Sequence, residues 1–352
     1  MKKSIQQTLL SCAIILALSL VFTSCDDILG EWDRPAPAVV TPSTDSEPTP
    51  TTDPNLSTPL TIEAIVDGTH VRFANKASGD VTYKVDGGVA QTIPSGETGD
   101  ITLSAGGKVA FYGDNATYYN VSTCAKSSIG NVTNDCYVYG NIMSLISSSD
   151  FATATKLSSP DTFYRLFAGN EYIKNHPSHK LVLPATTLTN SCYASMFFNC
   201  SKLTEAPELP AETLASYCYD SMFVGCTGLT TAPELPAETL APNCYNSMFA
   251  NCTGLTTAPE LPATTLANSC YIWMFNSCTK LSSITCKATG ATVTGDNLGT
   301  VDGTTSFLLG AGTAVTTPTI YVPASEIATY QALVPDGTGT QANWKANVTA
   351  IP

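Results

Sequence analysis

Apolar positions recur along the second half of the chain with a period of 26 residues. Four segments align without gaps, namely 183–208, 209–234, 235–260 and 261–286. In each of them a cysteine, a methionine and a second cysteine follow at intervals of four, as in Cys192, Met196 and Cys200. Residues four apart share one face of a helix, so this spacing predicts a short helix with an apolar face in every copy.

Each copy continues into a segment that resembles a short strand. Leu203 and Ala206 are expected to point into the core, and Pro207, Pro233 and Pro259 recur at one position of successive copies. Proline cannot donate a hydrogen bond to a neighbouring strand. We therefore expect a parallel strand of about three or four residues that ends near the proline.

A degenerate copy precedes the regular ones. Phe163 and Phe167 match Tyr193 and Phe197, and Asn170 falls where the later copies have a cysteine. One copy cannot bury its own apolar face, whereas about five stacked copies bury it continuously, with atypical copies at the ends. The pattern thus predicts an α/β solenoid over residues 161–286.

The preceding part of the chain alternates short apolar runs with turn residues. The runs cover residues 61–65, 69–74, 81–85, 90–93, 101–103 and 108–112. Glycines such as those in Gly87-Gly88 and Gly106-Gly107 supply the positive φ angles of tight turns between them. Six such strands predict a small all-β, sandwich-like domain over residues 60–122, in which the sequence indicates no site. Residues 123–160 are then a connector and N-terminal cap, and residues 287–352 a C-terminal cap.

The N-terminus carries signals of export. Lys2 and Lys3 precede an apolar run over residues 9–22, which is too short to span a membrane because a spanning helix needs about 20 residues. Residues 1–24 are therefore expected to be a signal peptide. Residues 25–59 are rich in proline, threonine and serine and predict an extended tether.

The end of that run, Val-Phe-Thr-Ser-Cys, resembles a bacterial lipobox. The resemblance implies cleavage before Cys25 and acylation of its sulfur and its amine, which gives stable anchoring. Asp26 and Asp27 follow directly and look like the surface-export signal of Bacteroidetes lipoproteins. The expected location is the outer membrane, with the protein exposed at the cell surface and the membrane contacted through the lipid alone.

Composition narrows the classes of function. The 352 residues include 43% hydrophobic ones, which is enough for buried cores, and carry a formal net charge of -13. Nucleic acid is not an expected partner, because only 16 lysines and arginines are present and binding to phosphates needs them in clusters. Three histidines offer little material for a metal centre or a general base. We therefore expect no enzyme and no cofactor.

The cysteines of the repeats come in pairs eight residues apart. Eight helical residues span about 12 Å, whereas a disulfide requires Cα atoms roughly 4.4–6.8 Å apart. Two columns of buried thiols are therefore predicted, and links between neighbouring copies remain an alternative. Cys124 and Cys136 flank a short loop and are the most plausible disulfide.

Stacked copies would align equivalent side chains in rows on the surface. Candidate ligand-binding residues are the carboxylates Glu208, Glu234 and Glu260, the hydroxyls Thr230 and Thr256, and the rings Tyr193, Tyr219, Tyr245 and Tyr271. The carboxylates would attract Ca²⁺ or a basic partner, or only keep the chain soluble. The rings would hold a sugar or a protein if exposed, or pack half-buried with hydrated hydroxyls.

The order Phe-x-x-Cys-x-x-Leu, followed by a strand with prolines, resembles the BspA-like leucine-rich repeat surface proteins of Bacteroidales. The period of 26 also lies within the range of roughly 20–29 residues of leucine-rich repeats. The resemblance covers about residues 160–352 and implies adhesion to proteins of a host or a neighbouring cell. A glycan-binding accessory protein is the alternative.

Overall fold

The computed structural model describes residues 53–120, 122–131, 133–298, 300–301, 304–334, 336–337 and 341–352. The expected signal peptide (1–24) and Cys25, with the tether as far as residue 52, lie outside this part of the chain. The described part is mostly sheet and turn with few helices, and none of its sheets closes into a barrel. The helices are the α-helices α3 (Gly295–Leu298) and α4 (Ile327–Leu333) and the 3₁₀ helices η1 (Ile142–Leu145), η2 (Gly290–Thr292), η3 (Ser306–Leu308), η4 (Ala324–Glu326) and η5 (Lys345–Asn347).

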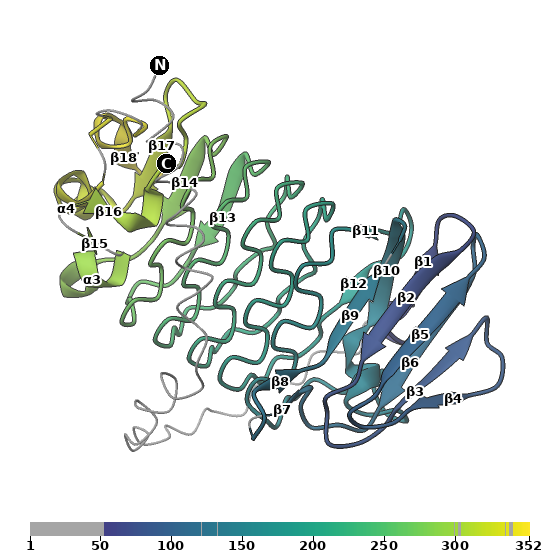
Figure 1. The fold of residues 1–352 in the computed structure, drawn as a ribbon. Helices are drawn as coiled ribbons and strands as arrows, with labels where there is room; N and C mark the ends of the chain where they lie inside the picture. Colours follow the sequence, from purple (N-terminus) through teal and green to yellow (C-terminus); the bar gives the residue numbers. More distant parts are fainter. Residues whose placement is uncertain are drawn as a thin grey trace. The chain divides into compact units, whose positions relative to one another are not determined.

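The first described elements are six strands connected by tight turns, as the sequence predicts (Figure 1). They are β1 (Thr61–Ala64), β2 (Thr69–Ala74), β3 (Val81–Val85), β4 (Gln91–Ile93), β5 (Thr98–Leu103) and β6 (Lys108–Gly113). Strands β1, β6, β3 and β4 lie in one sheet and β2 and β5 in another. Phe73 of β2 and Phe111 of β6 meet with ring centroids 5.1 Å apart, so the two sheets share one core.

The two sheets also take in strands that follow residue 122. These are β9 (Ser128–Asn131), which pairs with β2, and β10 (Cys136–Asn141), which pairs with β1. A separate pair consists of β7 (Tyr119–Asn120) and β8 (Ala125–Lys126). On its other side β10 pairs in parallel with β11 (Ile173–Asn175) and β12 (Leu181–Val182), both within the degenerate copy or directly after it. The hydrogen bonding of this sheet therefore continues from the β domain into the first repeats.

The helices expected in the repeats are not formed. In copy 183–208 the segment around Met196 is a run of overlapping four-residue turns, with positive φ at Ser191, Ser195 and Asn199. Alternate residues of the run donate their N–H groups to the carbonyl three residues earlier, at 3.0–3.3 Å from Cys192 to Cys200. A turn that repeats every four residues places positions i, i+4 and i+8 on one side just as a helix does, which is why the period alone misleads.

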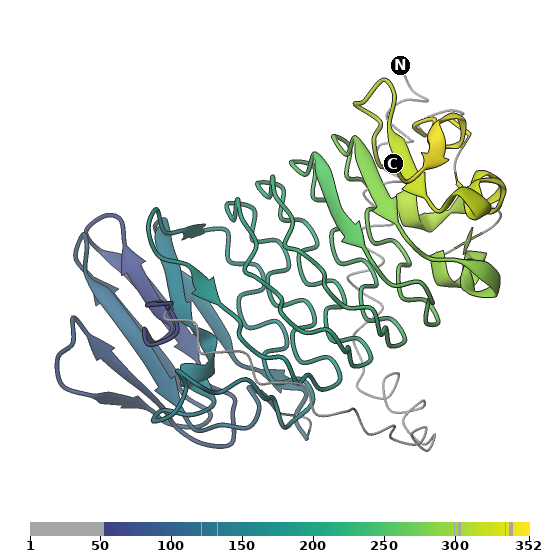
Figure 2. The same cartoon turned by 180° about the vertical axis from the view of Figure 1, so that it is seen from behind.

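The intervening residues of each run connect the copies. The N–H groups of Tyr193 and Phe197 donate to the carbonyls of Cys218 and Met222, 3.0 and 2.9 Å away. The degenerate copy repeats this pattern, with Phe163 donating to Cys192 at 2.8 Å, so its alignment is confirmed. We call the copies of residues 161–286, joined in this way, the repeat stack; its copies lie side by side in both views (Figures 1 and 2).

Equivalent side chains form columns inside the repeat stack. Phe167, Phe197, Phe223, Phe249 and Phe275 lie one above the next, with successive ring centroids 5.4–5.7 Å apart. The repeat cysteines and methionines are fully buried beside them. The predicted continuous core is thus present without helices.

The proline segments make less sheet than the sequence predicts. Glu205 and Thr231 form an isolated parallel bridge. Within the described part of the four regular copies, the strands are β13 (Thr257–Leu261) and β14 (Ser283–Cys286), both toward the end of the stack. The register of β13 on β14 shifts between Thr257 and Glu260, where Pro259 has no N–H to donate. The prolines therefore interrupt the ladder on this face.

The C-terminal residues cover the last copy, as expected for a cap. The carbonyls of Asn297, Phe307 and Leu309 accept from the final turn run, at 3.1, 3.2 and 2.7 Å. Strand β17 (Thr319–Val322) pairs with β14 and β18 (Val348–Ala350), and the short hairpin β15 (Thr300–Val301) and β16 (Thr304–Thr305) precedes them. Trp344 is buried and donates its indole N–H to the carbonyl of Ala311 at 3.1 Å.

Candidate functional site

A groove of about 590 Å³ runs along two neighbouring proline segments of the repeat stack. Residues 230–236 line one side, and residues 256–260 with Pro262 line the other. Four of the predicted ligand-binding residues lie in it: Thr230, Glu234, Thr256 and Glu260. We call it the Thr/Pro/Glu groove. The prolines at both sides lack N–H groups, so this part of the stack cannot form a full backbone ladder.

The glutamates at the groove are exposed to solvent. Glu260 pairs with Lys287 at one end, and Glu208 contacts Lys180 at 3.5 Å at the other end of the row. Glu234, between them, forms no ion pair within the part of the chain that the structure describes. The middle of the groove is therefore negatively charged and open to a basic group.

The threonines anchor the segments to each other. Thr230 donates its N–H and its hydroxyl to the carbonyl of Thr204, at 3.1 and 3.3 Å. Ser282 makes the same two bonds to the carbonyl of Thr256, at 2.9 and 2.8 Å. The first pair of bonds holds segment 230–236 to the preceding copy, and the second holds segment 256–260 to the following copy.

The tyrosine column cannot bind a ligand. Tyr193, Tyr219, Tyr245 and Tyr271 are only 1–2% exposed and stack with ring centroids 5.8–6.1 Å apart. The interpretation as an exposed platform is wrong. The alternative is right that the rings are packing groups, but they are fully rather than half buried, and the hydroxyls of Tyr193 and Tyr219 lie inside the core without a hydrogen-bond partner. Burial raises the pKa of these tyrosines well above the usual value.

The repeat cysteines form two buried columns of thiols, as predicted, and no disulfide joins neighbouring copies. Burial raises the pKa of Cys192 and of Cys226 to about 12, so their thiolates are scarce at neutral pH. The predicted bridge between Cys124 and Cys136 is not formed. Cys136 is buried on β10, whereas Cys124 lies in the exposed turn between β7 and β8.

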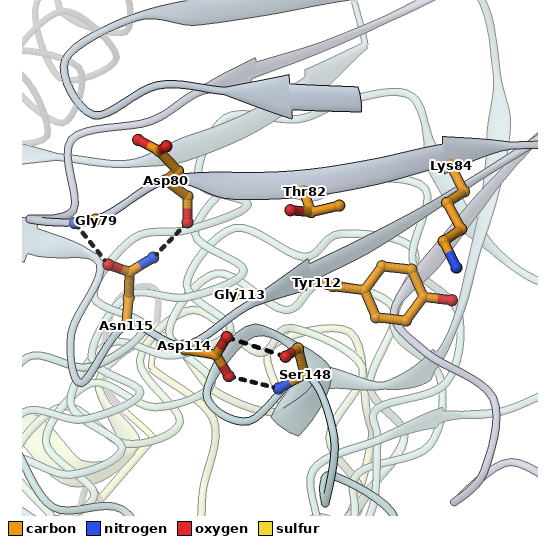
Figure 3. Close-up of a pocket in the computed structure, with 9 residues that line it drawn as sticks. All are labelled: Gly79, Asp80, Thr82, Lys84, Tyr112, Gly113, Asp114, Asn115 and Ser148. Carbon is orange, nitrogen blue, oxygen red and sulfur yellow. Dashed lines mark hydrogen bonds between the residues drawn. The ribbon is translucent and has the colours of Figure 1, made fainter. Parts of the chain in front are cut away.

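A second hollow, of about 470 Å³, lies on the β domain and was not expected from the sequence (Figure 3). Its lining combines acidic, basic, hydroxyl and aromatic residues, namely Asp80, Asp114, Lys84, Thr82 and Tyr112. The signal that the sequence did hold is the alternation of polar residues at 80, 82 and 84, which predicts one solvent-facing side of a strand.

The described residues contain no cluster of three or more histidine, cysteine, aspartate or glutamate side chains placed to hold a metal ion. Among the helices of this same part of the chain, none has the length and apolar character needed to cross a bilayer.

Comparisons with known proteins give no relative. No model of a protein family matches the chain, and neither curated proteins nor solved structures give a significant match.

Proposed function

We propose that this chain is a lipid-anchored protein of the outer cell surface whose repeats form a leucine-rich repeat solenoid that binds other proteins. The observation that carries the proposal is the Thr/Pro/Glu groove, in which equivalent exposed residues of two copies line one continuous hollow. Solenoid proteins use such rows to bind macromolecules, because an extended partner contacts several copies at once.

The chemistry of the groove favours an extended polypeptide with basic side chains. Pro236, which is exposed, and Pro259, which is partly exposed, give the two sides a stiff apolar surface, and Glu234 offers a carboxylate without an internal partner among the described residues. Lys180 and Lys287 limit the negative charge at the ends of the row, so a partner with one or two basic residues at the centre fits best.

A role in binding rather than catalysis is supported by the state of the thiols. The cysteines of the repeats are buried, and burial raises the pKa of Cys244 to about 12, which makes such thiols poor nucleophiles. We also propose that binding needs no metal, since Glu208 and Glu260 contact lysines rather than each other. Glycan capture by the tyrosine column has lost its basis, because those rings are buried.

The test is binding of the full chain to immobilised fibronectin, fibrinogen, laminin and collagen. We expect saturable binding to at least one of them that weakens as salt is raised, is unchanged by EDTA and falls about tenfold or more in Glu234→Lys. The matched control is Glu238→Lys, an equal change of charge at an exposed residue outside the groove. Absence of binding to all four proteins, or equal losses in both variants, would overturn the proposal.

A further inference from the structure

The outer face of strands β3 and β6 carries polar side chains that the proposed function does not use. Along β3, residues 82 and 84 point to one side, since successive side chains of a strand alternate, and Asp80 directly precedes the strand. Val81 of β3 and Phe111 of β6 are fully buried and face the core on the other side. In the ladder Thr82 lies opposite Tyr112, so the hollow is built on a rigid pair of strands.

The hollow has two different ends. Asp80 and Asp114 lie at one end and Lys84 lies at the other, beside the ring of Tyr112 (Figure 3). Asp80 and Lys84 are four residues apart along the strand, or about 13 Å, which is too far for an ion pair. The carboxyl group of Asp114 and the ammonium group of Lys84 are held apart across a space of about 470 Å³, whereas the carboxyl group of Asp80 points away from Asp114 (Figure 3).

Some of these groups are fixed and others are left open. Asp114 accepts hydrogen bonds from the N–H and the hydroxyl of Ser148 at 2.8 and 2.9 Å, and Asp80 accepts from the N–H of Ser95 at 3.1 Å. Within the described residues, the hydroxyls of Thr82 and Tyr112 make no hydrogen bond. The ammonium of Lys84 makes a cation–π contact there, 5.4 Å from the centre of the Tyr112 ring.

We propose that this hollow binds a neutral sugar unit. A sugar presents hydroxyls that donate to the carboxylate of Asp114, while its oxygens accept from Lys84, Thr82 and Tyr112. The ring of Tyr112 adds a partly apolar surface for its C–H groups. The two carboxylates and one ammonium leave an excess of negative charge, which disfavours an anionic ligand. The volume lies within the range of roughly 300–1,000 Å³ that small-molecule sites occupy.

The experiment is titration of the full chain with maltotriose, cellotriose, mannotriose, xylotriose and N-acetyllactosamine, followed by saturation-transfer NMR and calorimetry. At least one neutral sugar should bind saturably, and Asp114→Asn and Lys84→Met should each weaken binding about tenfold. Both variants keep the size of the side chain at the protein surface, and their circular dichroism spectra should match that of the wild type.

Two control variants show whether the sugar is held in this hollow or elsewhere on the surface. Glu97→Ala removes an exposed carboxylate outside the hollow and should leave the affinity unchanged. Glu234→Lys in the Thr/Pro/Glu groove should also leave it unchanged, so the two proposals can fail independently. The sugar site is refuted if no neutral sugar binds, if Asp114→Asn and Lys84→Met bind as well as the wild type, or if 3′-sialyllactose binds more tightly than every neutral sugar.

Discussion

The sulfur of Cys226 lies 3.1 Å from the carbonyl oxygen of Phe197 in the preceding copy and donates its thiol hydrogen to it. The same oxygen already accepts the N–H of Cys200 at 3.0 Å, so the thiol uses its second lone pair. Cys252 and Cys278 repeat the bond to Phe223 and Phe249, at 3.1 and 3.0 Å. The cysteine is thus both a small apolar group and a weak donor between neighbouring copies.

This bond predicts thiols that are chemically inert in the native protein. Burial raises the pKa of Cys278 to about 12, and only the thiolate reacts. We expect the eight cysteines of copies 183–286 that lie in the turn runs to react with Ellman's reagent only after denaturation, with mass spectrometry identifying the labelled positions. Rapid labelling of Cys226 in the folded protein would contradict the structure.

Asp220 predicts a stability that depends on pH. Its carboxyl lies in the turn run, and burial raises its pKa to about 7, partly offset by a hydrogen bond from Ser221. The folded protein therefore holds this proton up to about pH 7, whereas the unfolded chain releases it near pH 4. Since the folded pKa is the higher one, this carboxyl favours the folded state below pH 4, and the advantage is lost as the pH rises to 7.

Replacing this carboxyl by an amide tests the direction of this pH dependence of stability. The next copy has Asn246 at the equivalent position, so Asp220→Asn is compatible with the fold. At pH 8 the variant should be more stable than the wild type by about 1–2 kcal/mol, and the difference should vanish near pH 4, as measured by urea unfolding. An equal difference in stability at both pH values would show that the carboxyl does not titrate as described.

The unpartnered hydroxyl of Tyr219 predicts a substitution that does no harm. Removing a buried polar group without a partner removes a cost, so Tyr219→Phe should leave stability unchanged or raise it by about 1 kcal/mol. The matched control is Tyr118→Phe, because the buried hydroxyl of Tyr118 donates to the carbonyl of Leu145 at 2.8 Å. That variant should lose about 1–3 kcal/mol in thermal unfolding. Equal effects of the two substitutions would contradict the assignment of partners.

The proposed lipid anchor makes a separate prediction about Cys25. Cells fed a labelled fatty acid should incorporate the label into the wild-type protein but not into Cys25→Ala, because the thiol is the expected point of attachment. The wild type should fractionate with membranes and be accessible to protease on intact cells. Incorporation of label into Cys25→Ala would rule out this residue as the anchor.

The strands of the β domain could be predicted, because two-residue alternation and glycine turns are local signals. The positions of the repeats and their register also follow from the sequence, as the bond from Phe163 to Cys192 shows. The conformation within each repeat did not follow from the period, because turns of four residues and helices place the same side chains together. A signal was present in Asn199, Gly225 and Asn251, which precede a buried cysteine and have positive φ; asparagine and glycine favour that region.

The candidate sites needed the three-dimensional structure for a different reason. Exposure of the tyrosine column depends on which side of the turn run it faces. The spacing of Tyr193 and its equivalents in the sequence would be the same whether they faced the core or the solvent. The sequence did predict the rows of glutamates and threonines along the Thr/Pro/Glu groove. The hollow itself could not be predicted, because it depends on how far the prolines interrupt the hydrogen-bond ladder. The pocket at Lys84 joins residues from β3, β6 and the loop at Ser148, which no single stretch of sequence contains.

The backbone bonds that join the turn runs of neighbouring copies run in one direction, opposite to the bonds that Thr230, Ser282 and the Cys226 thiol donate to the preceding copy. N–H groups of each turn run point toward the following copy, as from Tyr193 to Cys218, and carbonyls accept from the preceding one, as from Phe163 to Cys192. Every internal copy thus presents the same acceptor side and the same donor side, while the two ends are closed by different segments. Gain or loss of whole 26-residue units would therefore change the length of the proposed binding face in fixed steps. The segments that close the two ends would stay the same, so variants of different length could arise by duplication or deletion of single units.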